Sequence, residues 1–543
     1  MPLLPSSVWP HGALRIVRLW SLLLVVLQGL SACASLPPPP PRTPTQALAE
    51  PQATALGKRV AAVQPAANLS GFRVVTSGTD ALAVLMTLAD QAERTLDLQY
   101  YLVHNEASTR ALLQHVRAAA DRGVRVRLLV DDMHTAGNDD ALLRMTRHPR
   151  IEVRLYNPLP SGRFSTITKV LGSLHDVSRI NRRMHNKMFV ADNALAFSGG
   201  RNLGDAYFLQ SDKANFVDMD LLVAGPAVRA LSRSFDRYWN SELAYPVEAL
   251  VSADTPAATP ASAASTAAPA GASAPQPQPA LDAPPPAEPT IGMAAESAAR
   301  DIAPGGRLRL QWAPARLLAD DPAKIENGGA EVGPDQTMFD DVASLLRSAR
   351  REVLIISPYL VPGQRGMAVF HELRQRGVMV RVLTSSLAAT DAPVVHAGYS
   401  RYRRPMLQEG IELYELRPQI SAASARLGAF GQSRARLHAK ALVVDGRWLL
   451  VGSMNLDPRS IDLNSEIGLL LNSPALAEDF RRLFDDVVQN NSYRLELRND
   501  TNLRWVTQSR DGPAVVEDSE PESTFLRRLS FWLMAPIAPE EML

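Results

Sequence analysis

The pattern of apolar and polar residues predicts the same run of strands and helices twice along the chain. In the first run, TLDLQYYLV (95–103) predicts a buried strand, TRALLQHVRAAADRG a helix that ends at Gly123, and VRVRLLVDD an alternating strand. In the second, REVLIISPYLV predicts a strand, MAVFHELRQRG a helix that ends at Gly377, and VRVLTSS a further strand. IEVRLYNP (151–158) is matched by IELYELRP (411–418). This alternation predicts an internal duplication of an α/β sheet layered with helices.

Composition divides the chain into segments. Its 543 residues exceed the usual size of one domain. Residues 252–300 are almost entirely Ala, Pro, Ser and Thr, and they predict a disordered linker because they cannot bury enough apolar surface. Residues 34–69 begin with LPPPPPRTPTQ after the leader and predict a proline-rich spacer that does not pack. Two folded domains are therefore expected, at 70–251 and 301–500, followed by a tail at 501–543.

The first 33 residues predict a lipoprotein signal peptide. Basic residues precede the apolar run LWSLLLVVLQGL, which is too short to span a membrane comfortably. The ending Leu30-Ser31-Ala32-Cys33 resembles a bacterial lipobox, which implies cleavage before Cys33 and lipidation of its thiol. The alternative is an ordinary signal peptide with an incidental cysteine. We expect a periplasm-facing, membrane-anchored lipoprotein of the bacterial cell envelope, and Ala34 favours the outer membrane.

The tail and the net charge bear on possible partners. STFLRRLSFWLMAPI (523–537) places its large apolar residues on one helical arc, as in a helix that lies in a lipid interface. The alternative is docking onto the protein body. The formal net charge is only +1, so nonspecific binding along nucleic acid is not expected. Cys33 is the only cysteine, which excludes an intramolecular disulfide.

Each half of the chain carries one copy of a polar motif. The first copy is His185-x-Lys187, Asp192 and Gly199-Gly200-x-Asn202; the second is His438-x-Lys440, Asp445 and Gly452-Ser453-x-Asn455. Residues two apart on a strand point to the same face, so each histidine projects beside its lysine. The turn allows close approach of the backbone, and its asparagine can donate a hydrogen bond. The predicted phosphate-binding residues are Gly200, Asn202, Ser453 and Asn455.

Two imidazoles and two ammonium groups that converge from two repeats predict a phosphodiester site, because the lysines neutralise the non-bridging oxygens. A zinc site is not expected, because the only cysteine lies in the leader and lysines would repel a cation. The lysines supply the positive charge, so neither a metal nor an organic cofactor is expected. Asp192 and Asp445 either close a strand turn through hydrogen bonds or take a direct part in the chemistry.

The paired motifs resemble those of the phospholipase D superfamily. RRMHNK, GGRNLGDAYF, YWNSELAYP and SLAATD are similar to the corresponding segments of bacterial cardiolipin synthases of the C type. The resemblance implies two phospholipase D-like domains, each a mixed sheet flanked by helices, with the active site at their pseudo-two-fold interface. It also implies a ping-pong exchange through a phosphohistidine, with His185 as nucleophile and His438 as acid and base. Asp218 and Glu466 would orient the histidines, and the catalytic set would be His185, Lys187, Asp192, His438, Lys440 and Asp445.

The leading hypothesis for function is a phosphatidyltransferase that makes cardiolipin from phosphatidylglycerol and a second phospholipid. A hydrolytic phospholipase D that gives phosphatidic acid is the first alternative, because water can resolve the same intermediate. A nuclease with the same motifs and an inactive envelope scaffold are further alternatives. The expected partners are phospholipid substrates and a membrane surface, reached through Cys33 and the tail, and a monomer is expected.

Overall fold

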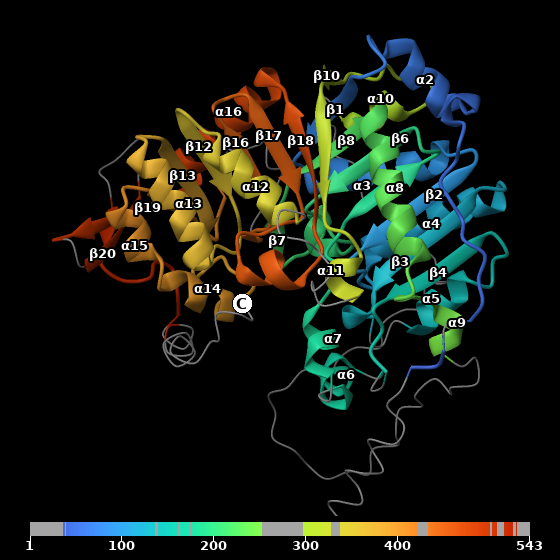
Figure 1. Cartoon of the computed structure of the whole chain (residues 1–543), viewed down its shortest axis with the longest axis horizontal. Coiled ribbons are helices and arrows are strands. Elements are labelled where there is room, and N and C mark those ends of the chain that lie inside the picture. Colours follow the sequence, from blue (N-terminus) through green and yellow to red (C-terminus); the bar gives the residue numbers. More distant parts are fainter. Residues whose placement is uncertain are drawn as a thin grey trace, which may run out of the picture.

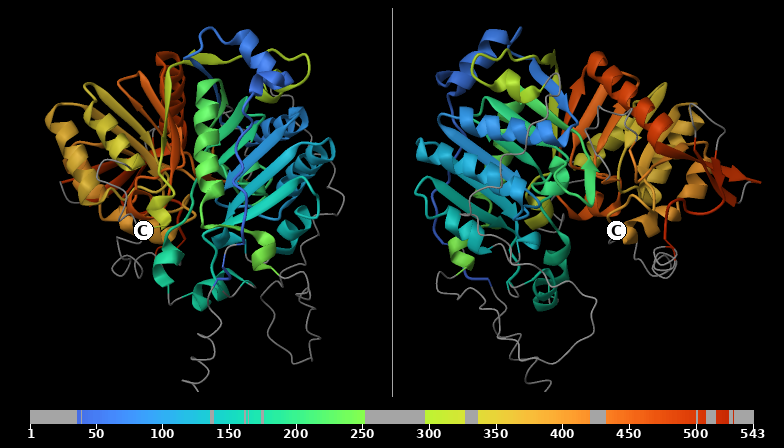
Figure 2. Two further views of the ribbon diagram at one scale, coloured as in Figure 1. Left: turned by 45° about the vertical axis from the view of Figure 1, so that its right-hand side comes forward. Right: turned by 180° about the vertical axis from the view of Figure 1, so that it is seen from behind.

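In the computed structural model, two β-sheets stand next to each other, and helices cover their outer faces (Figure 1; Figure 2). The structure describes residues 36–38, 40–135, 139–160, 163, 165–173, 176–251, 297–326, 337–420, 433–499, 502–507, 515–524 and 528. The predicted signal peptide with Cys33, nearly all of the predicted linker and the tail segment from Phe525, except Arg528, lie outside these residues. Within the described ranges, no helix has the length and apolar character needed to cross a bilayer.

The first sheet has nine strands, and its centre is parallel while its flanks are antiparallel. β2 pairs in parallel with β3, and β3 with β4, whereas β5, β6 and β8 follow in antiparallel pairing. In spatial order the strands are β10 (Gln311–Ala313), β1 (Ser70–Val75), β8 (Asp220–Ala224), β6 (Leu195–Gly199), β5 (Met188–Ala191), β2 (Thr95–Tyr100), β3 (Arg125–Asp131), β4 (Ile151–Tyr156) and β9 (Ala244–Pro246).

The second sheet repeats this pattern over ten strands. β12 pairs in parallel with β13, β13 with β14, and β16, β17 and β18 follow in antiparallel pairing. In spatial order the strands are β11 (Ala315–Ala319), β18 (Ile467–Asn472), β17 (Trp448–Gly452), β16 (Ala441–Val444), β12 (Glu352–Ile356), β13 (Met379–Ser385), β14 (Glu412–Leu416), β19 (Ser492–Arg498), β20 (Asn502–Thr507) and β21 (Val515–Glu517).

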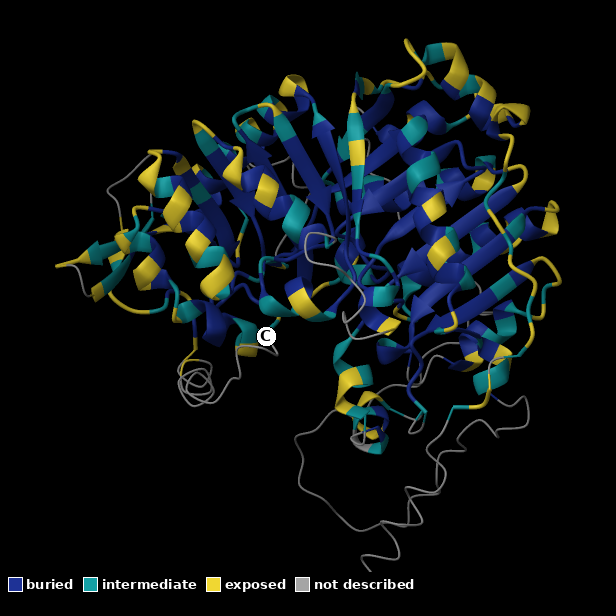
Figure 3. Cartoon of the chain, in the orientation of Figure 1, coloured by how far each residue is buried: buried dark blue, intermediate teal, exposed yellow. Residues whose placement is uncertain are grey.

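The two sheets divide the apolar core into three regions, and the sheets themselves are largely buried (Figure 3). α3 (Gly78–Gln91) and α4 (Ala107–Asp121) cover the outer face of the first sheet, and α12 (Met338–Arg347) and α13 (Gly363–Gln375) that of the second. The inner faces of both sheets share one cluster with α8 (Pro226–Asn240) and α16 (Pro474–Asn491). The two lobes therefore have a common core.

Shorter helices connect the strands. They are η1 (Pro51–Ala53), α2 (Ala55–Val63), η2 (Asp132–His134), α5 (Asp139–Met145), α6 (Thr166–Gly172), α7 (Val177–Asn181), η4 (Asp205–Phe208), α9 (Val247–Leu250), α10 (Ala298–Ile302), α11 (Ala323–Glu326), α14 (Pro393–Ser400), α15 (Arg403–Gln408) and the π-helical η6 (Arg459–Leu463).

The predicted duplication of an α/β unit is confirmed. α4 and α13 occupy equivalent places between the parallel strands of their sheets. Each is followed by a glycine with positive φ, Gly123 at 101° and Gly377 at 75°, a conformation that glycine adopts without strain. The duplicated order of strands and helices is therefore set by local sequence in both halves.

Two predicted boundaries are wrong. Residues 42–63 do not form an unpacked spacer, because Thr45 hydrogen bonds with Trp239, Asn240 and Arg127, and α2 buries Leu56. The second domain does not begin at 301. α10 packs against α3 and β10 pairs with β1, so the chain enters the second sheet only at β11. The spacer was predicted from its proline content, and proline content does not show which residues of a segment form contacts with the rest of the protein.

The lobes are also joined by a small sheet of their own. β7 (Ala214–Val217) from the first lobe pairs in parallel with β15 (Arg434–Leu437) from the second. Both strands end immediately before a polar segment, Asp218 on one side and His438 on the other. The pairing therefore fixes the position of these two residues relative to each other.

Candidate active site

Each histidine of the repeated motif is held by the opposite lobe. His185 donates its backbone N–H to the carbonyl of Ser465 at 2.9 Å, and its Nδ1 lies 2.9 Å from Oε2 of Glu466. In the second lobe, His438 donates its backbone N–H to the carbonyl of Val217 at 2.8 Å, and its Nδ1 lies 2.6 Å from Oδ2 of Asp218. The two arrangements are equivalent and reciprocal.

These contacts determine which ring nitrogen is available. An imidazole that donates Nδ1–H to a carboxylate leaves Nε2 free as a nucleophile or base. The sequence named Asp218 and Glu466 as the acids that orient the histidines, and the structure brings each beside a histidine. It also shows that each acid contacts the histidine of the other repeat, which spacing along the chain could not indicate.

The polypeptide before His185 is held by a buried ion pair that the sequence did not predict. Arg183 lies 3.1 Å from Asp131 at the end of β3, and the other oxygen of Asp131 accepts the N–H of Met184 at 2.9 Å. Both charged side chains are buried. The sequence did contain one sign of this role. Asp131 is an acidic residue at the carboxyl end of a predicted central strand, and functional groups of α/β sheets are often found at such ends.

The two lysines lie beside the histidines with their ammonium groups buried. Lys187 donates to the carbonyl of His185 at 2.6 Å, and Lys440 donates to the carbonyl of His438. Burial lowers the pKa of Lys440 to about 8, and it also lowers that of Lys187. The sequence prediction that each lysine projects next to its histidine agrees with this geometry.

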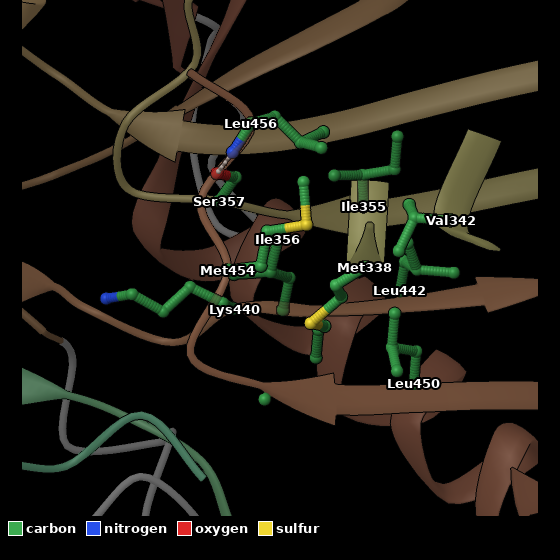
Figure 4. Close-up of a pocket in the computed structure, with 12 residues that line it drawn as sticks. Met338, Val342, Ile355, Ile356, Ser357, Lys440, Leu442, Leu450, Met454 and Leu456 are labelled. Carbon is green, nitrogen blue, oxygen red and sulfur yellow. Dashed lines mark hydrogen bonds between the residues drawn. The ribbon is translucent and has the colours of Figure 1, made fainter. Parts of the chain in front are cut away.

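A small pocket lies behind the stem of each lysine. Figure 4 shows a small pocket behind Lys440, with the ammonium nitrogen turned away from Met338, Met454 and Leu450. A second small pocket behind Lys187 has a mixed lining, in which Leu85 and Phe197 stand beside polar groups such as Arg201 and Asp220. Apolar surface therefore lies behind the Lys440 stem, and burial of both ammonium groups is the cause of their desolvation.

The surroundings of both histidines favour their neutral forms, more strongly for His185 than for His438. Burial lowers the pKa of His185, and the ammonium groups of Lys187 and Lys440 lower it further. Burial and Lys440 likewise lower the pKa of His438, although Asp218 opposes this shift. His438 is among the groups whose charge acts on His185, so both histidines belong to one electrostatic site.

The two acids differ in charge state. Burial opposes ionisation of Asp218, but His438 and Lys440 outweigh it and lower the pKa of Asp218 to about 2. Burial raises the pKa of Glu466 to about 7, against the opposing effect of Lys187. His438 is therefore paired with a carboxylate that is ionised at neutral pH and His185 with one that titrates near neutrality.

The small residues of the two turns contact the acids rather than an open anion site. A Cβ atom at Gly200 would lie 2.1 Å from Oδ1 of Asp218, so only glycine fits there. At the equivalent position, Ser453 donates its hydroxyl to Glu466 and accepts the N–H of Ile467 at 3.0 Å. Gly200 and Ser453 thus lie against the acids, and their predicted contact with a phosphate stays a prediction.

The two motif asparagines are buried next to these turns. Nδ2 of Asn202 donates to the hydroxyl of Tyr207 at 3.0 Å, and the backbone N–H of Asn455 donates to Ser460 at 3.3 Å. Within the described ranges, the side-chain oxygens of Asn202 and Asn455 have no hydrogen-bond partner. Their predicted contact with a phosphate stays a prediction.

Asp192 and Asp445 lie at the far ends of β5 and β16, away from the histidines. Asp192 accepts the backbone N–H groups of Glu93, Arg94 and Thr95 at 2.7–2.9 Å. Asp445 accepts the equivalent groups of residues 350–352 at 2.7–3.1 Å. Both have positive φ, 52° and 53°. The structure places them in turns, so they do not belong among the groups that surround the histidines.

We expect Asp192→Ala to lower the free energy of unfolding by about 3 kcal/mol and Asp445→Ala by about 1 kcal/mol. Asp192 is fully buried and its loss leaves buried N–H donors unpaired, whereas water can replace Asp445 at a more exposed turn. Both variants place alanine at a positive φ, so this strain cancels in the comparison. Urea unfolding measures the difference, and equal losses would contradict it.

Aromatic rings line the site on both sides. The ring of Tyr101 lies 5.0 Å from that of His185, and the ring of Tyr207 lies 5.2 Å from that of His438, both edge-on. Neither tyrosine was singled out in the sequence, although Tyr207 stands within the GGRNLGDAYF segment. No cluster of metal-ligating side chains occurs in the part of the chain that the structure describes.

A family model and similar proteins of known name both match this chain, and they point to the same family. The family model of the cardiolipin synthase, PLD-like domain matches residues 85–239 and 342–488, one segment in each lobe. Cardiolipin synthase C of Escherichia coli (strain K12) is 38% identical over 476 residues, which cover 87% of this chain and 96% of that protein. Cardiolipin synthase of Geobacillus kaustophilus (strain HTA426) is 24% identical and covers 75% of this chain and 64% of its own length.

A solved structure supports the same architecture. The crystal structure of phosphatidylserine synthase from Haemophilus influenzae Rd KW20 covers 90% of this chain and 100% of its own, with a TM-score of 0.54. At 14% sequence identity this likeness concerns the fold. The duplicated arrangement of two mixed sheets thus occurs in an independently determined structure.

Proposed function

Because this chain belongs to the cardiolipin synthase family with phospholipase D-like domains, we propose that it transfers phosphatidyl groups between glycerophospholipids and makes cardiolipin. The reciprocal pairing of His185 with Glu466 and of His438 with Asp218 carries the proposal. It leaves two free imidazole nitrogens in one site with two buried ammonium groups. That set can attack, protonate and neutralise a phosphodiester without further groups.

In the first half of the reaction, Nε2 of His185 attacks phosphorus of a phospholipid. A nitrogen–phosphorus bond forms while the bond to the headgroup oxygen breaks, and the imidazolium form of His438, stabilised by Asp218, donates its Nε2 proton to the departing oxygen. Lys187 and Lys440 neutralise the two non-bridging oxygens as charge develops on them. The product is a phosphatidyl-histidine and a free headgroup alcohol.

In the second half, a hydroxyl group of phosphatidylglycerol replaces the alcohol that has left. His438 takes the proton of this hydroxyl, its oxygen attacks phosphorus, and the bond to His185 breaks. The product is cardiolipin, and both histidines return to their starting states. Water in place of the second lipid would give phosphatidic acid.

The different acids support this division of roles. A carboxylate that stays ionised stabilises the imidazolium that a general acid and base must carry, so Asp218 suits His438 for that role. His185 is neutral beside two ammonium groups, which suits an attacking imidazole. The proposal therefore makes His185 the nucleophile and His438 the proton carrier.

The product of the purified full-length chain tests the proposal. We expect vesicles of phosphatidylglycerol and phosphatidylethanolamine to yield cardiolipin as the main product, measured by mass spectrometry of the extracted lipids. Phosphatidic acid alone would make the protein a hydrolase, and no lipid product would reject both activities.

We further propose that lipidated Cys33 anchors the protein to a membrane of the cell envelope, facing the periplasm, with the outer membrane slightly favoured. The lipobox-like sequence before Cys33 and the lipid substrate support this placement. We expect Cys33→Ala to abolish incorporation of labelled fatty acid and to leave the uncleaved precursor. Labelling of the Cys33→Ala protein equal to that of the parent would contradict the anchor.

A further inference from the structure

The two sides of the catalytic site are lined by corresponding tyrosines with different partners. Tyr101 follows β2 and Tyr359 follows β12, each within the sequence Tyr-Leu-Val. The ring of Tyr101 lies 5.3 Å from the ammonium nitrogen of Lys187, and that of Tyr359 lies 5.9 Å from the ammonium nitrogen of Lys440. Each tyrosine thus covers the lysine of its own repeat.

The partners of the two hydroxyl groups break this symmetry. The hydroxyl of Tyr101 lies 2.9 Å from Nε2 of His134, whereas the hydroxyl of Tyr359 donates to Oδ2 of Asp391 at 2.9 Å. Burial lowers the pKa of His134 to about 4, so this partner is neutral. The first side therefore presents a neutral pair and the second side an anionic one.

Asp391 is exposed and lies on the side of His438. It ends the segment Ser386–Asp391, between β13 and α14, and its charge acts on His438, Lys440 and Tyr207. In the proposed function, His438 exchanges a proton with the headgroup alcohol. The alcohol therefore lies on the same side of the phosphorus as His438. None of the proposed chemical steps requires an anionic group at the position of Asp391.

We propose that Tyr359 and Asp391 bind the polar headgroup that leaves or enters beside His438, and that the Asp391 carboxylate favours headgroups with a primary ammonium group. This inference rests on the proposed function. Lys187 and Lys440 repel a cationic headgroup held next to the phosphate, and a nearby carboxylate offsets that repulsion. An ammonium group between a carboxylate and an aromatic face also gains from both.

The test compares three donor lipids in mixed micelles with the full-length chain: phosphatidylethanolamine, phosphatidylglycerol and phosphatidylmethanol. We expect Asp391→Asn to lower kcat/KM for phosphatidylethanolamine about 10- to 100-fold, as for loss of a bond to a charged group. kcat/KM for phosphatidylglycerol and phosphatidylmethanol should change less than about 3-fold, since neither headgroup carries a cation. Tyr359→Phe should lower the ethanolamine preference less, because the carboxylate remains.

Two control variants separate the possible explanations. Asp479→Asn removes an exposed carboxylate on α16 and should leave all three rates unchanged. His134→Gln alters the partner of Tyr101 and should leave the preference between headgroups unchanged, whatever its effect on rate. An equal loss on all three lipids, or no loss on any, would overturn the inference. A wild-type chain inactive on every lipid would instead reject the proposed function.

Discussion

Replacing His185 with asparagine is expected to lower kcat for phosphatidyl transfer by at least about 10⁴-fold, because it removes the nucleophile that forms the covalent intermediate. Asparagine can still donate a hydrogen bond toward Glu466, so the loop before β5 should keep its position. His438→Asn should cost about 10²- to 10⁴-fold with natural lipids, the range for loss of a general acid and base. Initial rates of cardiolipin formation measure both effects.

The two variants should differ with an activated donor. A phosphatidyl ester of p-nitrophenol has a leaving group that needs no proton, so His438→Asn should release p-nitrophenol in its first turnover at a rate near that of the wild type. His185→Asn should release none. Release by His185→Asn but not by His438→Asn would reverse the assigned roles, and equal release by both would remove the division between them.

Replacing Asp218 with asparagine should lower kcat with natural lipids about 10³- to 10⁴-fold, as in catalytic triads whose carboxylate is replaced by an amide. The charge of Asp218 raises the pKa of His438, so its removal lowers that pKa further. Protonated His438 then becomes scarce at neutral pH, and the activity of Asp218→Asn should rise as the pH is lowered. The pH profile of kcat, measured with phosphatidylglycerol, checks this sign.

Glu466→Gln is the matched variant in the other pair. The pKa of Glu466 is raised to about 7 by burial, so a neutral side chain here is close to a state that the wild type already populates. We therefore expect a smaller loss, about 10- to 100-fold, with little change in pH profile. Thermal unfolding of both variants separates these losses from loss of structure. A larger loss for Glu466→Gln than for Asp218→Asn would contradict the unequal roles of the acids.

Local sequence was sufficient to predict the repeated strand–helix–strand segments and the residues of the motif. His185 and Lys187 are two apart before a strand, and the whole pattern recurs at His438, so the prediction needed only spacing and repetition. Gly123 and Gly377 marked the ends of equivalent helices for the same reason. Each of these features is decided within about fifteen residues along the chain.

Contacts between distant segments were not predictable in this way. Asp218 lies 220 positions from its partner His438, and Glu466 lies 281 from His185, so no local signal shows that the pairs cross between lobes. The segment around Thr45 was predicted not to pack because it is rich in proline, yet its backbone and hydroxyl contact α8. Composition describes the average behaviour of a segment and does not describe such individual contacts.

The most direct measurement is mass spectrometry of the His438→Asn variant, quenched after one turnover of the p-nitrophenyl donor. If both lobes act on the same phosphorus atom, the phosphatidyl group will be found on His185, and wild-type protein will pass it on to phosphatidylglycerol. A phosphatidyl group attached to any other residue, or transfer with no modified protein at all, would contradict the mechanism.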